Sequence, residues 1–305
     1  MAMRFPLLAQ SVRFYLTTLT FVCYLSLVSF GKAEEHSSID LDPSLPPVRA
    51  LTEAYTEDLD VLKRFHPWAM SERRHQRLKQ LIDLYSVSLH SVGFQGLSQE
   101  ERIDYLLFQN QLTFELRQLD QTRERHVEIL PWLPFGKDII ALAEARQRVE
   151  PIRPDDCSTI MYELKAQITR AQRKVRDDLQ QPDTALTPTL AGRVAQAIQR
   201  FKGVLREWYQ FYDGYHPSFT WWVKSPYESV VKALDDYAGF VRKEVAGFVD
   251  GEDPPVLGDP IGREALLEAL EYEMIAYTPE ELLEIAKKEF AWCERERRRA
   301  AKDLG

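Results

Sequence analysis

The sequence predicts an all-α fold, an array of about nine or ten helices joined by short loops. Apolar residues recur at every third or fourth position along most of the chain, a spacing that keeps one face of an α-helix apolar. The alternation of apolar and polar residues that a half-buried strand requires is absent. Segments containing proline and glycine separate the periodic stretches, and each is a natural end for a helix.

Composition sets broad limits on the class of protein. The chain has 305 residues, of which 45% are hydrophobic and 28% are charged, as in ordinary globular proteins. The formal net charge of −8 argues against a nucleic-acid-binding protein, because such proteins need a basic surface to displace phosphate counterions. Three cysteines without a Cys-x-x-Cys spacing are too few for a disulfide framework.

Residues 1–33 have the pattern of a secretory signal peptide. Two arginines precede an uncharged stretch at 14–30, and the small residues Gly31 and Ala33 come before a cleavage point at Glu34. The alternative is an uncleaved membrane anchor, because this apolar stretch is close to the shortest that spans a bilayer. We favour the cleaved signal, which predicts an exported protein that contacts a membrane only if the segment is retained.

An extended, proline-containing linker at 34–46 is expected to lead into one helical domain at 47–305. Helices within this domain should end where proline and glycine gather. These breaks fall near Pro67 and within 93–96, 131–136, 151–154, 182–188, 214–217 and 250–260.

Three helix starts carry capping signals. Ser98 with Glu101 predicts a capping box, in which each side chain accepts a hydrogen bond from the other residue's backbone N–H. Asp259 stands before a proline, as does Thr278, and Glu281 gives the latter a second capping box. The helix after Ser98 is expected to be periodic through Ile103, Leu107, Asn110 and Phe114.

Three apolar stripes predict the core-facing sides of three later helices. The first stripe consists of Ile160, Leu164, Ile168, Ala171, Val175 and Leu179. The second consists of Leu190, Val194, Ala197, Phe201, Val204 and Trp208. The third consists of Leu234, Tyr237, Val241, Val245 and Phe248.

Residues suited to metal binding or nucleophilic catalysis lack the spacing those chemistries need. No two of the six histidines lie within eight residues of each other, and no His-Glu-x-x-His segment occurs. A zinc site assembled from distant histidines and acids is the remaining alternative. No Gly-x-Ser-x-Gly elbow or Gly-x-Gly phosphate loop is present. Cys157 and Cys293 are expected to be small buried hydrophobic residues.

Two charged stretches are expected to be solvated helix faces. Glu264, Glu268 and Glu271 share one side of a helix, and paired carboxylates can perform acid–base catalysis. We expect a solvent-facing row instead, opposite the apolar Leu266, Leu267 and Leu270. The run at 294–299 interleaves acids with arginines and is expected to be an ordinary charged helix end.

Aromatic residues are concentrated at 208–227, where nine of the twenty residues are aromatic. We favour a helix–helix elbow packed with aromatic side chains. The alternative is the wall of a peptide or sugar groove, because indoles and phenols combine a large apolar body with a polar tip. The candidate residues for such a wall are Tyr215, Trp221, Trp222 and Tyr227.

The C-terminal segment 259–305 carries the most distinctive motifs of the chain. They are Gly262-Arg263, Leu270 with Glu273, the run Tyr277-Thr278-Pro279-Glu280-Glu281-Leu282, and Phe290-Ala291-Trp292 before an acidic and basic helix. In these features the segment resembles the domain-of-unknown-function 885 family. The helical pattern and the signal peptide upstream fit that family, so the resemblance extends over 46–305.

This resemblance implies an exported, all-α relative of zinc metallopeptidases, and therefore peptide hydrolysis. Family members carry their presumed zinc motif, a His-Glu pair followed by further histidines, downstream of the matching segment. No histidine follows His216 in this chain, so no zinc ligand or catalytic residue is carried over. The chain is expected to correspond to the N-terminal helical portion, to form one wall of a peptide cleft and to be inactive alone. The alternative is a free-standing exported helical binding or scaffold module.

A helical portion of a larger fold should leave some apolar helix faces uncovered. The faces expected to be exposed are those of the last helix and of the aromatic stretch. They comprise Leu282, Ala286, Phe290 and Cys293 in the former, and Trp221 and Trp222 in the latter. We therefore expect the chain to self-associate.

Overall fold

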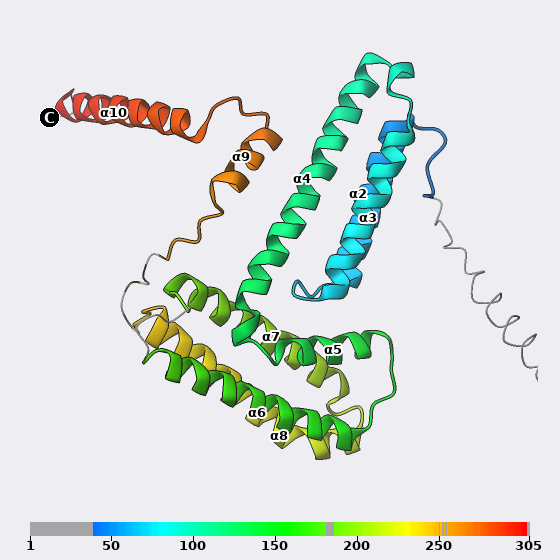
Figure 1. Ribbon diagram of the computed structural model, residues 1–305, viewed down its shortest axis with the longest axis vertical. Coiled ribbons are helices and arrows are strands. Elements are labelled where there is room, and N and C mark those ends of the chain that lie inside the picture. Colours follow the sequence, from blue (N-terminus) through cyan, green and yellow to red (C-terminus); the bar gives the residue numbers. More distant parts are fainter. Residues whose placement is uncertain are drawn as a thin grey trace, which may run out of the picture. The chain divides into compact units, whose positions relative to one another are not determined.

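A computed structural model describes residues 39–180, 186–249, 251, 253, 255 and 257–303 (Figure 1). The described residues form nine α-helices and three short helical turns, without a strand, which confirms the predicted all-α fold. The signal peptide expected at 1–33 and the first part of the linker expected at 34–46 lie outside the described residues. None of the described helices is both long enough and apolar enough to span a membrane.

The first three long helices pack against one another and surround a small aromatic centre. They are α2 (Pro47–Phe65), α3 (Glu72–Ser91) and α4 (Gln99–Ile129), with the turn η1 (Phe94–Gly96) before α4. The ring of Tyr55 lies 5.2 Å from that of Tyr85 and 5.5 Å from that of Phe108, both edge to face. The Tyr55 hydroxyl donates a 2.6 Å hydrogen bond to Glu115, so its polar end is satisfied in the interior.

The next four helices contain the larger hydrophobic core. They are α5 (Gly136–Gln147), α6 (Pro154–Asp178), α7 (Pro188–Tyr212) and α8 (Pro217–Phe240), with η2 (Leu130–Trp132) before α5 and the π-helical turn η3 (Val241–Val245) after α8. In Figure 1, α6 and α8 run side by side, and both contribute to this core. The three predicted stripes on α6, α7 and α8–η3 all pack in it, which confirms their core-facing assignment.

Close packing in this core requires a glycine at the start of α5. Gly136 is buried, and a Cβ atom there would lie 2.5 Å from Cζ of the Phe201 ring on α7. That distance is far inside van der Waals contact, so any larger residue would force the ring or the helix to move.

The helix after Ser98 buries a different face from the one expected. The capping box of Ser98 and Glu101 is present, but Ile103 and Leu107 are 51% and 45% exposed. The residues of α4 that pack into the first helical group are Tyr105, Phe108 and Leu112. Asn110 and Phe114, further along the predicted stripe, are half-buried, so the expected face is partly covered in its second half and open in its first.

The unburied side of α4 contacts the short helix α9 (Arg263–Tyr272) further along. The rings of Phe114 and Tyr272 stack with their centroids 4.0 Å apart, and the Asn110 amide donates a 3.1 Å hydrogen bond to the Tyr272 carbonyl. Leu266 and Leu267 of α9 are more than one third exposed, whereas Ala265 is buried. The expected apolar side opposite the acids is therefore exposed at Leu266 and Leu267, and only Leu270 of the three leucines is half-buried.

The last helix, α10 (Pro279–Asp303), has no buried residue. Its predicted capping box is present, since Thr278 and Glu281 each bond to the other's backbone N–H. Leu282 is half-buried, and the other expected apolar positions, Ala286, Phe290 and Cys293, are exposed. The expected uncovered face of the last helix is therefore confirmed, and the expectation that Cys293 is buried was wrong.

Candidate functional site

The aromatic stretch at 208–227 divides between core and surface. Its buried members are Trp208, Tyr209, Tyr212 and Phe219, and its most exposed members are Phe211, Tyr215, Trp221 and Trp222. Trp208 and Phe219 meet edge to face at 5.3 Å, which joins α7 to α8 across the turn between them. Half of the stretch is thus the packed elbow that we favoured, and half is an aromatic surface.

The four candidate groove residues differ in how far their side chains are exposed. Tyr215 is 86% exposed, Trp221 84% and Trp222 51%. Consecutive residues on an α-helix point about 100° apart, so Trp221 and Trp222 diverge and do not line one face. Tyr227 is partly buried and stacks on Tyr209 at 3.9 Å, and burial raises its pKa.

The carboxylates of α9 interact with α4 and are not uniformly solvated. Glu268 accepts a 2.8 Å hydrogen bond from Gln121 and lies 3.5 Å from the guanidinium of Arg117, with its side chain 20% exposed. Glu271 is 4.0 Å from the same arginine and remains largely exposed, as does Glu264. The expectation of a solvated row was therefore wrong for Glu268, which holds α9 on α4.

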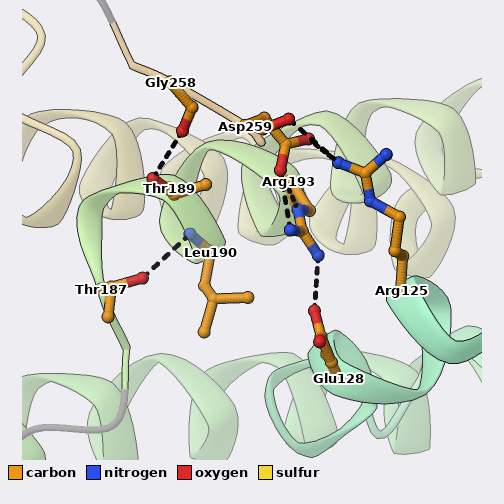
Figure 2. A network of polar contacts seen from close by, with 8 residues as sticks. All are labelled: Arg125, Glu128, Thr187, Thr189, Leu190, Arg193, Gly258 and Asp259. Atoms are coloured by element: carbon orange, nitrogen blue, oxygen red, sulfur yellow. Dashed lines mark hydrogen bonds and ion pairs between the residues drawn. The ribbon is translucent and has the colours of Figure 1, made fainter. Parts of the chain in front are cut away.

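Asp259 does not cap the following helix, contrary to expectation, because α9 begins at Arg263 with Gly262 as its N-cap at φ +88°. Instead, Asp259 belongs to an ion-pair network between α4 and α7 (Figure 2). Its carboxylate lies 2.7 Å from the Arg193 guanidinium and 2.5 Å from that of Arg125. Arg193 also donates a 2.6 Å hydrogen bond to Glu128.

The Asp259 network fixes the segment that precedes α9. Thr189 on α7 donates a 2.9 Å hydrogen bond to the Gly258 carbonyl beside it (Figure 2). Partial burial of Asp259 opposes ionisation, but hydrogen bonds from Arg193 and Arg125 outweigh it and hold the pKa of the carboxyl below its usual range. Asp259 is therefore charged at neutral pH.

Replacing Arg193 with methionine should loosen this segment without unfolding the protein. The ion pairs are partly exposed, so we expect a loss of less than about 1 kcal/mol in the free energy of unfolding. Protease cleavage within 257–262 should become faster, as measured by limited proteolysis with mass spectrometry. Arg206→Met, an exposed change on the same helix, is the control. Equal cleavage in both variants would contradict the role assigned to Arg193.

A cavity of about 490 Å³ is lined by α3, α4, the last turns of α2 and the loop between α2 and α3. Its wall includes Leu59, Leu78, Ile82 and Leu119, and its polar lining includes His75 and His126. His75 lies 3.7 Å from Asp120. Burial, together with the positive charge of Arg200, lowers the pKa of His126, which is therefore neutral at pH 7.

Sequence analysis did not find this cavity. Its residues come from three helices and share no local motif, and the histidines were considered only as metal ligands. The spacing of apolar residues on α3 and α4 predicts which helix faces are buried. It does not indicate where two packed faces leave a space between them.

The described residues give little support for cysteine-based catalysis or metal binding. Cys157 is buried as expected, and burial raises the pKa of its thiol to about 11. No three His, Cys, Asp or Glu side chains are grouped to hold a metal ion in the described part of the chain.

Comparison with family models, with curated proteins and with solved structures finds no match to this chain.

Proposed function

We propose that this chain is the N-terminal helical portion of an exported zinc-metallopeptidase-like protein and forms one wall of its peptide cleft. In this proposal the chain carries neither the zinc ligands nor the catalytic groups. It supplies packing surface for a metal-binding portion and apolar surface for a peptide substrate.

The observation that carries the proposal is the uncovered apolar face of α10. This helix begins with the Tyr-Thr-Pro-Glu-Glu-Leu run on which the family resemblance chiefly rests, and none of its 25 residues is buried. Phe290 is 69% exposed, and Leu283, seven residues earlier and therefore on the same face, is 55% exposed. An amphipathic helix of this length gains most of its stability by burying its apolar face, so the face is suited to packing against a further protein element.

The aromatic surface of the α7–α8 turn supports the peptide-cleft part of the proposal. Tyr215 and Trp221 are more than four fifths exposed, although side chains of this size are usually covered. Aromatic rings bind extended peptides through apolar contact and offer hydroxyl or indole groups for hydrogen bonds.

A second candidate is a free-standing exported helical binding or scaffold module. The observation that favours it is that the core of α5–α8 and the buried aromatic centre of α2–α4 both form from residues of this chain. In this case the aromatic surface and α10 would bind a separate partner protein.

The two candidates differ in what the transcript encodes after the codon for Gly305. We expect an in-frame continuation with a His-Glu motif. The longer product should hold roughly one zinc ion per molecule and cleave a peptide library, and the present chain should do neither. Elemental analysis and mass spectrometry of digests measure both properties. Tightly bound zinc in the present chain, or a transcript without such a motif, would contradict the proposal.

A further inference from the structure

The cavity between α3 and α4 has an aliphatic wall. Leucine, isoleucine, valine, methionine and alanine supply all of its apolar side chains, and the only rings in its lining are the imidazoles of two histidines. Its volume of about 490 Å³ is within the range of small-molecule sites. An aliphatic wall without aromatic rings is suited to a flexible alkyl chain, whereas flat ring systems are usually bound against other rings.

The polar groups of the cavity favour an anion. The two carboxylates in its lining already have partners, since Glu72 binds Arg123 and Glu115 accepts hydrogen bonds from Tyr55 and Gln111. Lys63, Thr122 and His126 are donors whose side chains make no hydrogen bond or ion pair to any residue in the described ranges. Lys63 and Thr122 are exposed and His126 is half-buried, so a ligand that supplies acceptors would replace water at these donors, and a negative charge would complement Lys63.

The helix turns that carry these donors lie near one another. Thr122 and His126 are neighbours on one face of α4, because they are four residues apart. The ion pair between Glu72 and Arg123 places the start of α3 beside this part of α4. Arg74 on the same turn of α3 donates to the Lys63 carbonyl, which brings the end of α2 to the same place.

Aliphatic residues line the cavity along its length, from Met70, Val127 and Leu130 near the donors to the middle of α3 and α4. Leu78 and Ile82 follow along α3, and Leu119 faces the cavity from α4. From Glu115 to Val127, the twelve steps of α4 that line the cavity span about 18 Å at about 1.5 Å per residue. The site thus combines aliphatic side chains along its length with donors near the end of α2, and its length suits a medium alkyl chain.

We propose that this cavity binds a fatty carboxylate, with its carboxylate at Lys63, Thr122 and His126 and its alkyl chain along Leu78, Ile82 and Leu119. The Lys63 ammonium forms a charge-assisted hydrogen bond with the carboxylate, and Thr122 donates a second. Burial of the alkyl chain supplies most of the affinity, and Lys63 selects a charged headgroup over a neutral one.

Isothermal titration of the full chain with dodecanoate and with dodecanol tests this site. We expect one dodecanoate molecule per chain and at least about tenfold weaker binding of dodecanol, which lacks the charge. Lys63→Met should weaken dodecanoate binding by about tenfold and leave dodecanol binding unchanged. Arg64→Met is the matched control, because Arg64 is the adjacent exposed cation on α2 and does not line the cavity.

A second variant tests whether the ligand binds in this cavity or on another apolar surface of the protein. Leu119→Trp should fill the channel and abolish binding of both probes, while circular dichroism shows that the protein remains folded. Unchanged binding in this folded variant would overturn the proposal. Equal affinity for dodecanoate and dodecanol would also overturn it. Tighter binding of a peptide that ends in a leucine carboxylate would overturn the assignment to a fatty acid.

Discussion

Replacing Trp208 with alanine should lower the free energy of unfolding by about 3–5 kcal/mol. Trp208 is 1% exposed and lies at the contact between α7 and α8, with its ring edge to face with those of Tyr212 and Phe219. Removing the indole leaves a large cavity in a closely packed core, and it also removes two aromatic contacts. Denaturant unfolding monitored by circular dichroism measures the loss as a lower midpoint at similar slope.

Trp221→Ala is the matched control, because it deletes the same side chain from the same aromatic stretch at a site that is 84% exposed. We expect a change within about 0.5 kcal/mol, as for most surface substitutions. A similar loss in both variants would show that Trp221 is buried in solution. A loss below about 1 kcal/mol at Trp208 would contradict the packing of the α7–α8 elbow.

The core helices could be predicted from the sequence because each has a single dominant apolar stripe. Val194, Phe201 and Trp208 on α7 pack where the spacing places them, since all three belong to the one apolar stripe of this helix. The capping box at Ser98 was also predictable, because it depends only on residues three positions apart. Local signals of this kind determine helix positions without knowledge of the tertiary fold.

The buried face could not be predicted where a helix has apolar residues on several sides. On α4, Ile103 and Leu107 suggested one face, whereas Tyr105, Phe108 and Leu112 are the residues that α2 and α3 cover. Which face is covered depends on the positions of other helices. The same limit explains α9, whose inner side contains Glu268 because α4 provides Arg117 and Gln121 as partners.

The candidate site was predictable only in its exposed aromatic part. Clustering in the sequence identified Tyr215, Trp221 and Trp222 as unusual, and their exposure is a property of the fold. The fatty-carboxylate site could not be predicted, because Lys63 and His126 are far apart in the sequence. They line one cavity only after α2 and α4 have packed beside α3.

Replacing Phe290 with glutamate should reduce dye binding and self-association of the protein while leaving its stability nearly unchanged. Phe290 is 69% exposed on a helix without buried residues, so its replacement removes no core contact and should cost less than about 0.5 kcal/mol. An exposed apolar helix face binds ANS and associates with other apolar faces, because both processes remove it from water. Light scattering over a concentration series measures association, and ANS fluorescence measures the accessible apolar surface.

Ala291→Glu is the control that distinguishes the loss of apolar surface from the gain of a negative charge. This control adds the same negative charge to the same turn of α10 but removes only a methyl group. We expect wild-type association and dye binding in the control and a clear loss of both in Phe290→Glu. The difference between the two variants is the informative quantity, because the aliphatic cavity between α3 and α4 can also bind the dye and is unchanged in both. If the wild-type protein is monomeric and binds negligible dye, the α10 face is covered in solution. The proposal that the apolar face of α10 packs against a further protein element would then be wrong.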